Sequence, residues 1–232
     1  MRWGFLIAIL ILIQGVQAEE PQLRCEKNWG ERTWEGMKFH RYHLRAERFP
    51  PNKKYRFIVE SFDGIRTEIF DYVANKKGHL ILIRPDEDYK DEIYAICPAK
   101  RGERLTFWMK SEEDAYFTQL VPFPLEKRSK KGIKLNLELQ GGQGEKFLLS
   151  AEELESYEEI ELFLLIQGKQ VQIKTDEANQ YGELSAVIDL PTDPHGGEAK
   201  LILKRRKEEI VFPFQWGAPA LKIVGACCFE IK

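Results

Sequence analysis

The sequence predicts an all-β protein made of two tandem antiparallel β-sandwiches. In short segments, apolar and polar residues alternate with a period of two, and turn residues recur about every 8–12 residues. One turn motif also occurs twice, 104 residues apart. Aromatic residues make up 12% of the chain, which suits the pleated, half-buried surface of a sheet.

The expected strands follow one another in the same way in each half of the chain. Glycine, proline or asparagine residues bound them, as turn chemistry requires. In the first half the expected strands are 55–59, 79–83, 92–97 and 104–109. In the second half they are 160–166, 170–174, 184–190, 199–203 and 210–212.

The repeated motif has the form A-N-x-x-G-x-L, at residues 74–80 and again at residues 178–184. Asparagine bonds the backbone ahead of it, and glycine accepts a positive φ. The motif therefore predicts a structural β-turn at the same place in each domain, built on Asn75 and Gly78 and on Asn179 and Gly182.

An aromatic strand, an Asp-Gly turn, the A-N-x-x-G-x-L turn and a strand ending at proline follow in that order. This pattern resembles fibronectin-III-like, macroglobulin-like and bacterial immunoglobulin-like modules over residues 45–125 and 135–225. The resemblance implies immunoglobulin-like (Ig-like) sandwiches, which commonly serve as adhesins, spacers or accessory domains of envelope proteins.

The N-terminus has the form of a secretory signal. Arg2 precedes an apolar run at 5–13, and small residues end at Ala18. That run is shorter than the roughly 20 residues needed to span a bilayer. We expect a signal peptide at 1–18, a first domain at 19–126, a linker at 127–132 and a second domain at 133–232. None of the asparagines lies in an N-x-S/T sequon, which favours a bacterial exported protein, periplasmic or secreted.

The charges are nearly balanced, with 35 basic and 37 acidic side chains. This balance argues against a nucleic-acid partner, which needs a strong basic field. The basic runs 127–131 and 204–207 are interpreted as a linker and a solvated hairpin. Another envelope or extracellular protein is the expected partner.

Four cysteines remain after the expected cleavage, and export permits disulfides. Cys25–Cys97 is the preferred bond. Cys227 and Cys228 are interpreted as buried thiols in a last strand, with an intermolecular bond or a strained ring between them as alternatives.

No recognised catalytic motif occurs, so we predict no catalytic residues, no cofactor and no metal. His40 and His43 lie three apart, which on a strand places them on opposite faces. The acidic run 86–91 is expected to be a solvated turn rather than a calcium site. Acidic pairs could still form an enzyme site between the domains, which is the least favoured hypothesis.

Tryptophan suggests a second kind of binding. Trp108 lies in an apolar strand and is expected in the core, whereas Trp29 and Trp34 lie in a polar stretch containing glycine. Exposed tryptophans of that kind could form a platform for a sugar or a protein. The favoured function is therefore a non-catalytic binding or structural module, and a carbohydrate-binding accessory protein is the alternative.

Overall fold

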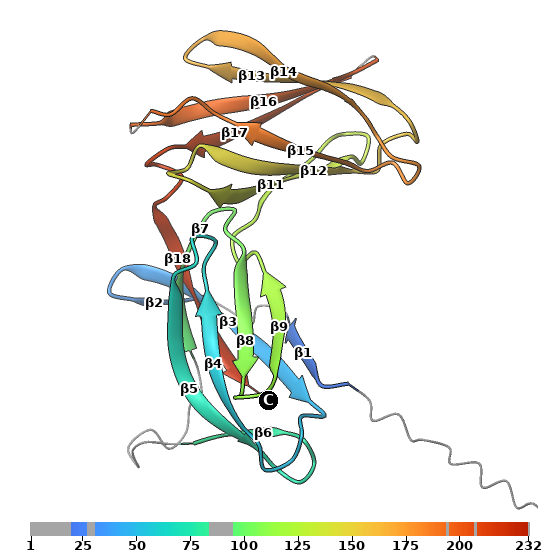
Figure 1. Ribbon diagram of the computed structural model, residues 1–232. Helices are drawn as coiled ribbons and strands as arrows, with labels where there is room; N and C mark the ends of the chain where they lie inside the picture. The colour runs from blue at the N-terminus through green and yellow to red at the C-terminus, as the bar shows by residue number, and fades with distance from the viewer. Residues whose placement is uncertain (1–19, 27–30, 84–94, 194, 207, 232) are drawn as a thin grey trace, which may run out of the picture.

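The computed structural model describes the whole chain except residues 1–19, 27–30, 84–94, 194, 207 and 232. The expected signal peptide and the acidic run 86–91 lie outside the described residues. Figure 1 shows two β-sandwiches, the second lying across one end of the first. The predicted all-β fold class is confirmed.

The first sandwich pairs two sheets, one ordered β1-β3-β18-β7 with β2 added on β3, and the other ordered β6-β5-β4-β8-β9. The strands of the first sheet are β1 (Gln22–Glu26), β2 (Glu31–Trp34), β3 (Met37–Glu47), β7 (Ala95–Lys100) and β18 (Ile223–Ile231). Those of the second are β4 (Lys54–Glu60), β5 (Arg66–Ala74), β6 (Leu80–Leu82), β8 (Leu105–Lys110) and β9 (Ala115–Leu120). Aromatic side chains dominate the core between them, which includes Tyr42, Tyr55, Phe57, Phe107 and Phe229.

The second sandwich pairs a sheet ordered β10-β11-β12-β15 with one ordered β14-β13-β16-β17. The strands of the first of these sheets are β10 (Leu125–Arg128), β11 (Lys134–Gly141), β12 (Lys146–Glu152) and β15 (Leu184–Asp189). Those of the other are β13 (Glu159–Ile166), β14 (Lys169–Glu177), β16 (Gly197–Arg205) and β17 (Glu208–Trp216). Its core is mostly aliphatic, with Phe147 and Trp216 among its largest buried side chains.

The predicted domain boundaries need two corrections. Residues 125–126 are not part of the first domain and residues 127–128 are not linker, because all four belong to β10 and pair with β11. The range 133–232 is not one domain, because β18 leaves the second sandwich and enters the first. There it pairs parallel with β3 and antiparallel with β7.

Strand β18 fills a gap in the first sandwich. The orders β1-β3-β18-β7 and β10-β11-β12-β15 correspond position by position, so β18 holds the place that β12 holds in the second sandwich. The side chains of Cys227, Phe229 and Ile231 are buried in the first core. A strand from the end of the chain therefore completes the first domain, and a purely local repeat could not indicate this.

The two sandwiches are also joined by direct bonds at their junction. The Gly102 amide donates to the Phe123 carbonyl at 2.7 Å, and the Leu139 amide donates to the Gly102 carbonyl at 2.8 Å. The Arg104 guanidinium makes two bonds to the carboxylate of Glu138, which is only 5% exposed. With the chain crossing twice, these contacts hold one sandwich against the other.

Candidate protein-binding surface

The outer face of the sheet β6-β5-β4-β8-β9 carries an apolar row. Ile58 of β4 is opposite Trp108 of β8, and Trp108 is opposite Phe117 of β9. The Trp108 and Phe117 rings lie 4.9 Å apart. Ile58 is only 8% exposed and Phe117 is 55% exposed, so the row, which we call the Trp108 face, opens to solvent at its Phe117 end.

The alternation of β8 explains why Trp108 points outward. Leu105, Phe107 and Met109 are fully buried in the core, so the residues between them face the other side of the sheet. The expectation that Trp108 belongs to the core was therefore wrong. Its polar neighbours on that face, Thr106 and Lys110, are the sequence signal that could have revealed this.

Polar groups surround and orient the apolar row. The Trp108 indole donates to Glu60 at 3.0 Å, and Lys110 Nζ lies 4.3 Å from the centre of the Trp108 ring. Glu60 also pairs with Arg66 at 2.9 Å. These contacts satisfy the indole N–H and leave the apolar edge of Phe117 available for contact.

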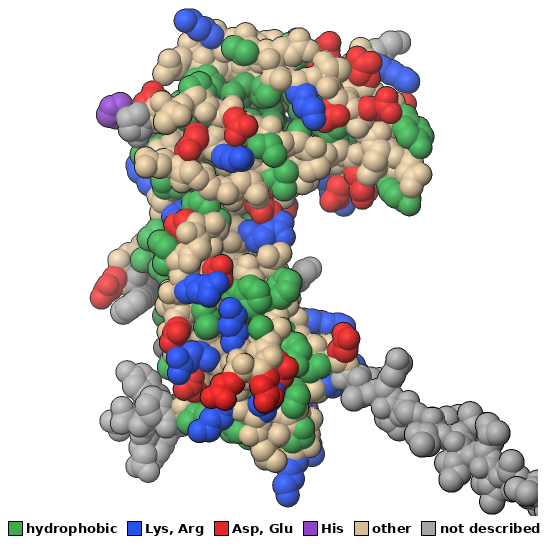
Figure 2. Space-filling view, in the orientation of Figure 1, with side chains coloured by type: hydrophobic (Ala, Val, Ile, Leu, Met, Phe, Trp, Pro, Cys, Tyr) green, Lys and Arg blue, Asp and Glu red, His purple; other side chains and the backbone are tan. Residues whose placement is uncertain are grey.

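The side of the face nearer to β5 is also charged but internally paired. Arg56 bonds Asp71 at 2.9 Å and Glu68 at 3.0 Å. The hydrogen bond from Arg56 to Asp71 raises the pKa of Arg56 further above its ordinary value. Figure 2 shows hydrophobic side chains gathered over β8 and β9 with charged side chains around them. An apolar centre with a polar rim is the usual composition of a protein–protein interface.

The predicted tryptophan platform lies only partly within the described residues, because Trp29 is outside them. Trp34 is the last residue of β2 and is opposite Met37 across the tight turn Glu35-Gly36, where both residues have positive φ. The hairpin formed by β2 and the start of β3 projects from the first sandwich (Figure 1). The backbone of Trp34 therefore lies at the tip of a projecting hairpin.

The two predicted structural turns have the same hydrogen bonds. Asn75 Oδ1 accepts the amides of residues 77 and 79, and Asn179 Oδ1 accepts those of residues 181 and 183, all at 2.8–3.1 Å. Gly78 and Gly182 have φ values of 76° and 73°. A β-carbon on Gly182 would lie 2.2 Å from the Leu154 carbonyl oxygen, so this turn is packed closely against the next loop.

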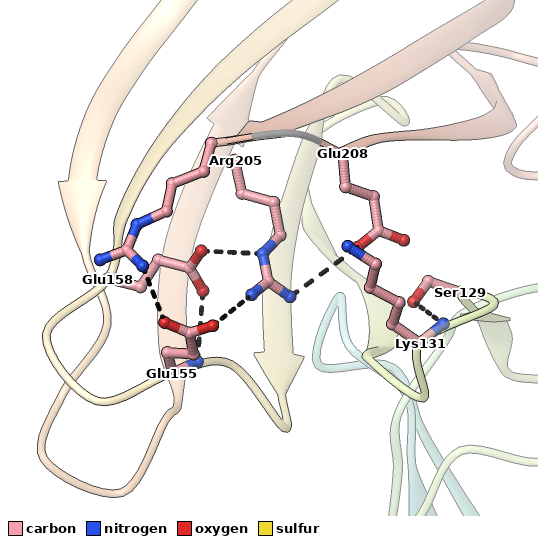
Figure 3. Close-up of polar contacts among 7 residues, drawn as sticks. Ser129, Lys131, Glu155, Glu158, Arg205 and Glu208 are labelled. Carbon is pink, nitrogen blue, oxygen red and sulfur yellow. Dashed lines mark hydrogen bonds and ion pairs between the residues drawn. The ribbon is translucent and has the colours of Figure 1, made fainter.

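The basic run 204–207 contributes to an ion-pair network at one end of the second sandwich (Figure 3). Arg205 Nε bonds Glu158, which is 2% exposed, at 2.8 Å. Arg206 bonds Glu155 at 3.2 Å, and Lys131 of the other basic run pairs with Glu208 at 3.7 Å. These cations are matched by carboxylates, so the network holds loops together rather than offering a free anion site.

None of the four cysteines forms a disulfide in this structure, so the preferred Cys25–Cys97 bond is absent from it. In the sheet β1-β3-β18-β7, two strands separate Cys25 on β1 from Cys97 on β7. Cys227 and Cys228 are buried in β18, as expected of thiols in a last strand, but this strand belongs to the first sandwich. Burial raises the pKa of the Cys25 thiol to about 12.

The histidines of β3 lie in different surroundings. His40 Nε2 is 3.8 Å from Glu31, and its ring packs 5.1 Å from Phe123. His43 is 3% exposed and lies 3.3 Å from Glu230. Among the described residues, no three His, Cys, Asp or Glu side chains are grouped so that they could hold a metal ion.

A groove of about 610 Å³ lies at the junction of the sandwiches, on the side of β16 and β17. Arg101, Lys200 and Lys222 line it, and Glu198 is its single carboxylate among the described residues. Its described lining includes no His, Cys, Ser or Asp. The charged side chains of the groove are therefore mostly positive. The described part of the chain also contains no helix with the length and apolarity needed to cross a bilayer.

Neither a protein-family model nor a curated protein matches the chain. Among solved structures, the chain is similar to a tetra-tandem repeat in the extending region of a large adhesion protein, at 10% identity and a TM-score of 0.28. That match covers 76% of this chain and 44% of the other. A second similarity is to the chicken interferon gamma receptor alpha chain, at 11% identity and a TM-score of 0.22, covering 80% of this chain and 89% of that one. At these TM-scores, function has to be argued from the residues of this chain.

Proposed function

We propose that this chain is an exported, non-catalytic binding module that docks another envelope or extracellular protein on the Trp108 face. The observation that carries the proposal is the row Ile58–Trp108–Phe117 on the solvent side of a sheet. Tryptophan and other large aromatic side chains at the centre of a contact surface contribute most of the binding energy in many interfaces.

The rim indicates the chemistry of the partner. Arg56 and Arg66 are already paired with acidic groups of the same face, whereas Lys110 lies over the Trp108 ring. We infer a protein surface that places an apolar side chain against Phe117 and a carboxylate toward Lys110. The mixed charge of the rim does not favour nucleic acid, which requires an extended basic surface.

The proposal that the chain is exported is based on the signal-like sequence of residues 1–18. A partner outside the cytoplasm follows from that proposal. The hydrogen bonds and the Arg104–Glu138 contact at the junction of the sandwiches would present the Trp108 face on a stiff support. A rigid support lowers the entropy lost when a partner binds.

The test compares three proteins consisting of residues 19–232: wild type, Phe117→Ser and Tyr181→Ser. Tyr181 is 75% exposed in the second sandwich, so its replacement controls for the loss of an exposed aromatic ring. Each protein is crosslinked in the native envelope fraction, and captured proteins are identified by mass spectrometry. We expect one protein to be captured by wild type and Tyr181→Ser but not by Phe117→Ser.

The captured protein is then purified and its affinity is measured directly. Removing an exposed aromatic anchor such as Phe117 should weaken binding by about tenfold or more. Equal affinity for wild type and Phe117→Ser would contradict the proposal.

The alternative function is carbohydrate binding through the hairpin of β2 and β3. The position of Trp34 at the tip of that hairpin is the observation that favours it. Titration with cell-wall glycans would then quench tryptophan fluorescence in wild type but not in Trp34→Ala. Quenching that persists in Trp34→Ala, or no quenching at all, would contradict this alternative.

A further inference from the structure

Two cysteines face each other where the end of the chain enters the first sandwich. Cys227 of β18 is directly opposite Cys97 of β7 in an antiparallel pair. Both side chains belong to the same core and are nearly inaccessible, at 0% and 4% exposure. Directly opposite residues of antiparallel strands have Cα atoms about 4.5–5.5 Å apart, within the range of about 4.4–6.8 Å that a disulfide spans.

The sheet order argues against a bond from Cys25 to Cys97 or to Cys227. Neighbouring strands lie about 4.8 Å apart, so Cys25 on β1 is on the order of 14 Å from Cys97 and 10 Å from Cys227 along the sheet. Both separations exceed the limit of about 7 Å for a disulfide. Cys228 follows Cys227 in the strand, so its side chain points to the opposite face from Cys97.

We propose that Cys97 and Cys227 are a disulfide-forming pair that fastens the last strand into the first sandwich when the chain folds under oxidising conditions. The two thiols lose two protons and two electrons and form one S–S bond. The acceptor is a small-molecule or protein disulfide, which is reduced to two thiols. The bond would close the chain around the whole second sandwich, from residue 97 to residue 227.

The burial of the pair dictates when the bond forms. Desolvation raises the pKa of the Cys227 thiol well above its ordinary value, so the folded, reduced protein holds almost no reactive thiolate there. Oxidation therefore occurs as β18 docks, before the core closes over the sulfurs. The same burial then shields the completed bond from reductants.

The experiment maps disulfides in residues 19–232 after refolding from denaturant in a mixture of reduced and oxidised glutathione. Free thiols are alkylated, and the protein is digested with trypsin without reduction. Trypsin releases Cys25, Cys97 and the last two cysteines on separate peptides, 25–27, 91–100 and 223–232. We expect peptide 91–100 linked to peptide 223–232 and peptide 25–27 alkylated.

Variants identify which of the two adjacent cysteines takes part. The link is expected to survive in the double variant Cys25→Ser/Cys228→Ser and to be lost in Cys227→Ser. In the double variant, the oxidised form is expected to melt about 5–15 °C above the reduced form.

Three outcomes would overturn the proposal. They are a link from peptide 25–27 to peptide 91–100, a link between two chains, and full alkylation of all four cysteines after refolding in the oxidising mixture. Because the mapping is done on the wild-type sequence, it remains decisive even where a variant does not fold.

Discussion

Phe229 lies close to the C-terminus in sequence, yet its replacement should destabilise the first sandwich severely. Its ring is 1% exposed and lies 4.4 Å from the ring of Phe107, 5.5 Å from Tyr42 and 6.5 Å from Phe57. Phe229→Ala therefore leaves a cavity walled by large rings held on three strands. Such a site collapses poorly, so the loss should be in the upper part of the range for this substitution, about 4 kcal/mol.

The assay is urea unfolding followed by circular dichroism. With a slope of about 2 kcal/mol per molar urea, a loss of about 4 kcal/mol lowers the unfolding midpoint by about 2 M. Ile223→Ala is the matched control, because Ile223 lies in the same strand but is 52% exposed. Its replacement should cost less than about 1 kcal/mol. Equal midpoints for Phe229→Ala and wild type would refute the placement of β18 in the first core.

Three further predictions concern a turn, the junction and pH. Gly182→Ala should lower the melting temperature more than Gly168→Ala does. Both glycines have positive φ, but only at Gly182 would the new β-carbon lie 2.2 Å from a backbone oxygen. Equal falls in melting temperature would contradict this. Arg104→Ala should cost about 2 kcal/mol in urea, because the buried Glu138 carboxylate loses its cation and is left with the Gln140 amide, and adding Glu138→Gln should restore part of the loss. Burial raises the pKa of Glu103 above 4.5, so the folded state binds the Glu103 proton more tightly than the unfolded chain does. The free energy of unfolding therefore falls as the pH rises from 4.5 through the pKa of Glu103 in the folded state. Glu103→Gln should flatten that part of the pH profile, and an unchanged slope would show that Glu103 is not its source.

The parts of the fold that depend on local sequence could be predicted from the sequence alone. Alternation and turn residues predicted about half of the strands, such as β4, β8 and β13, because both signals depend on residues that are close in the chain. The A-N-x-x-G-x-L turns are the clearest case, since Asn75 and Asn179 bond amides two and four residues ahead. Such a motif can be recognised in the sequence because its hydrogen bonds join residues within the motif itself.

The face of β8 could not be assigned with the same certainty. Phe107 and Trp108 are adjacent and both aromatic, so hydrophobicity alone does not decide which of them faces the core. In the structure Phe107 takes the inner side, and Trp108 becomes the centre of the candidate binding surface. The missing information is the register of β8 against its neighbours, which depends on residues about 50 positions away in β4.

The placement of β18 is the largest departure from the sequence prediction, and it has a consequence for folding. The second sandwich has all eight of its described strands between Leu125 and Trp216, so it can form from consecutive chain. The first sandwich lacks its central strand until Ile223–Ile231 arrives, after the whole second domain. Contacts between such distant segments form slowly, because closing the long loop between them costs chain entropy before the contacts can stabilise the fold. The first sandwich, although nearer the N-terminus, should therefore be the last to complete its core, and the pairing of Cys97 with Cys227 belongs to that final step.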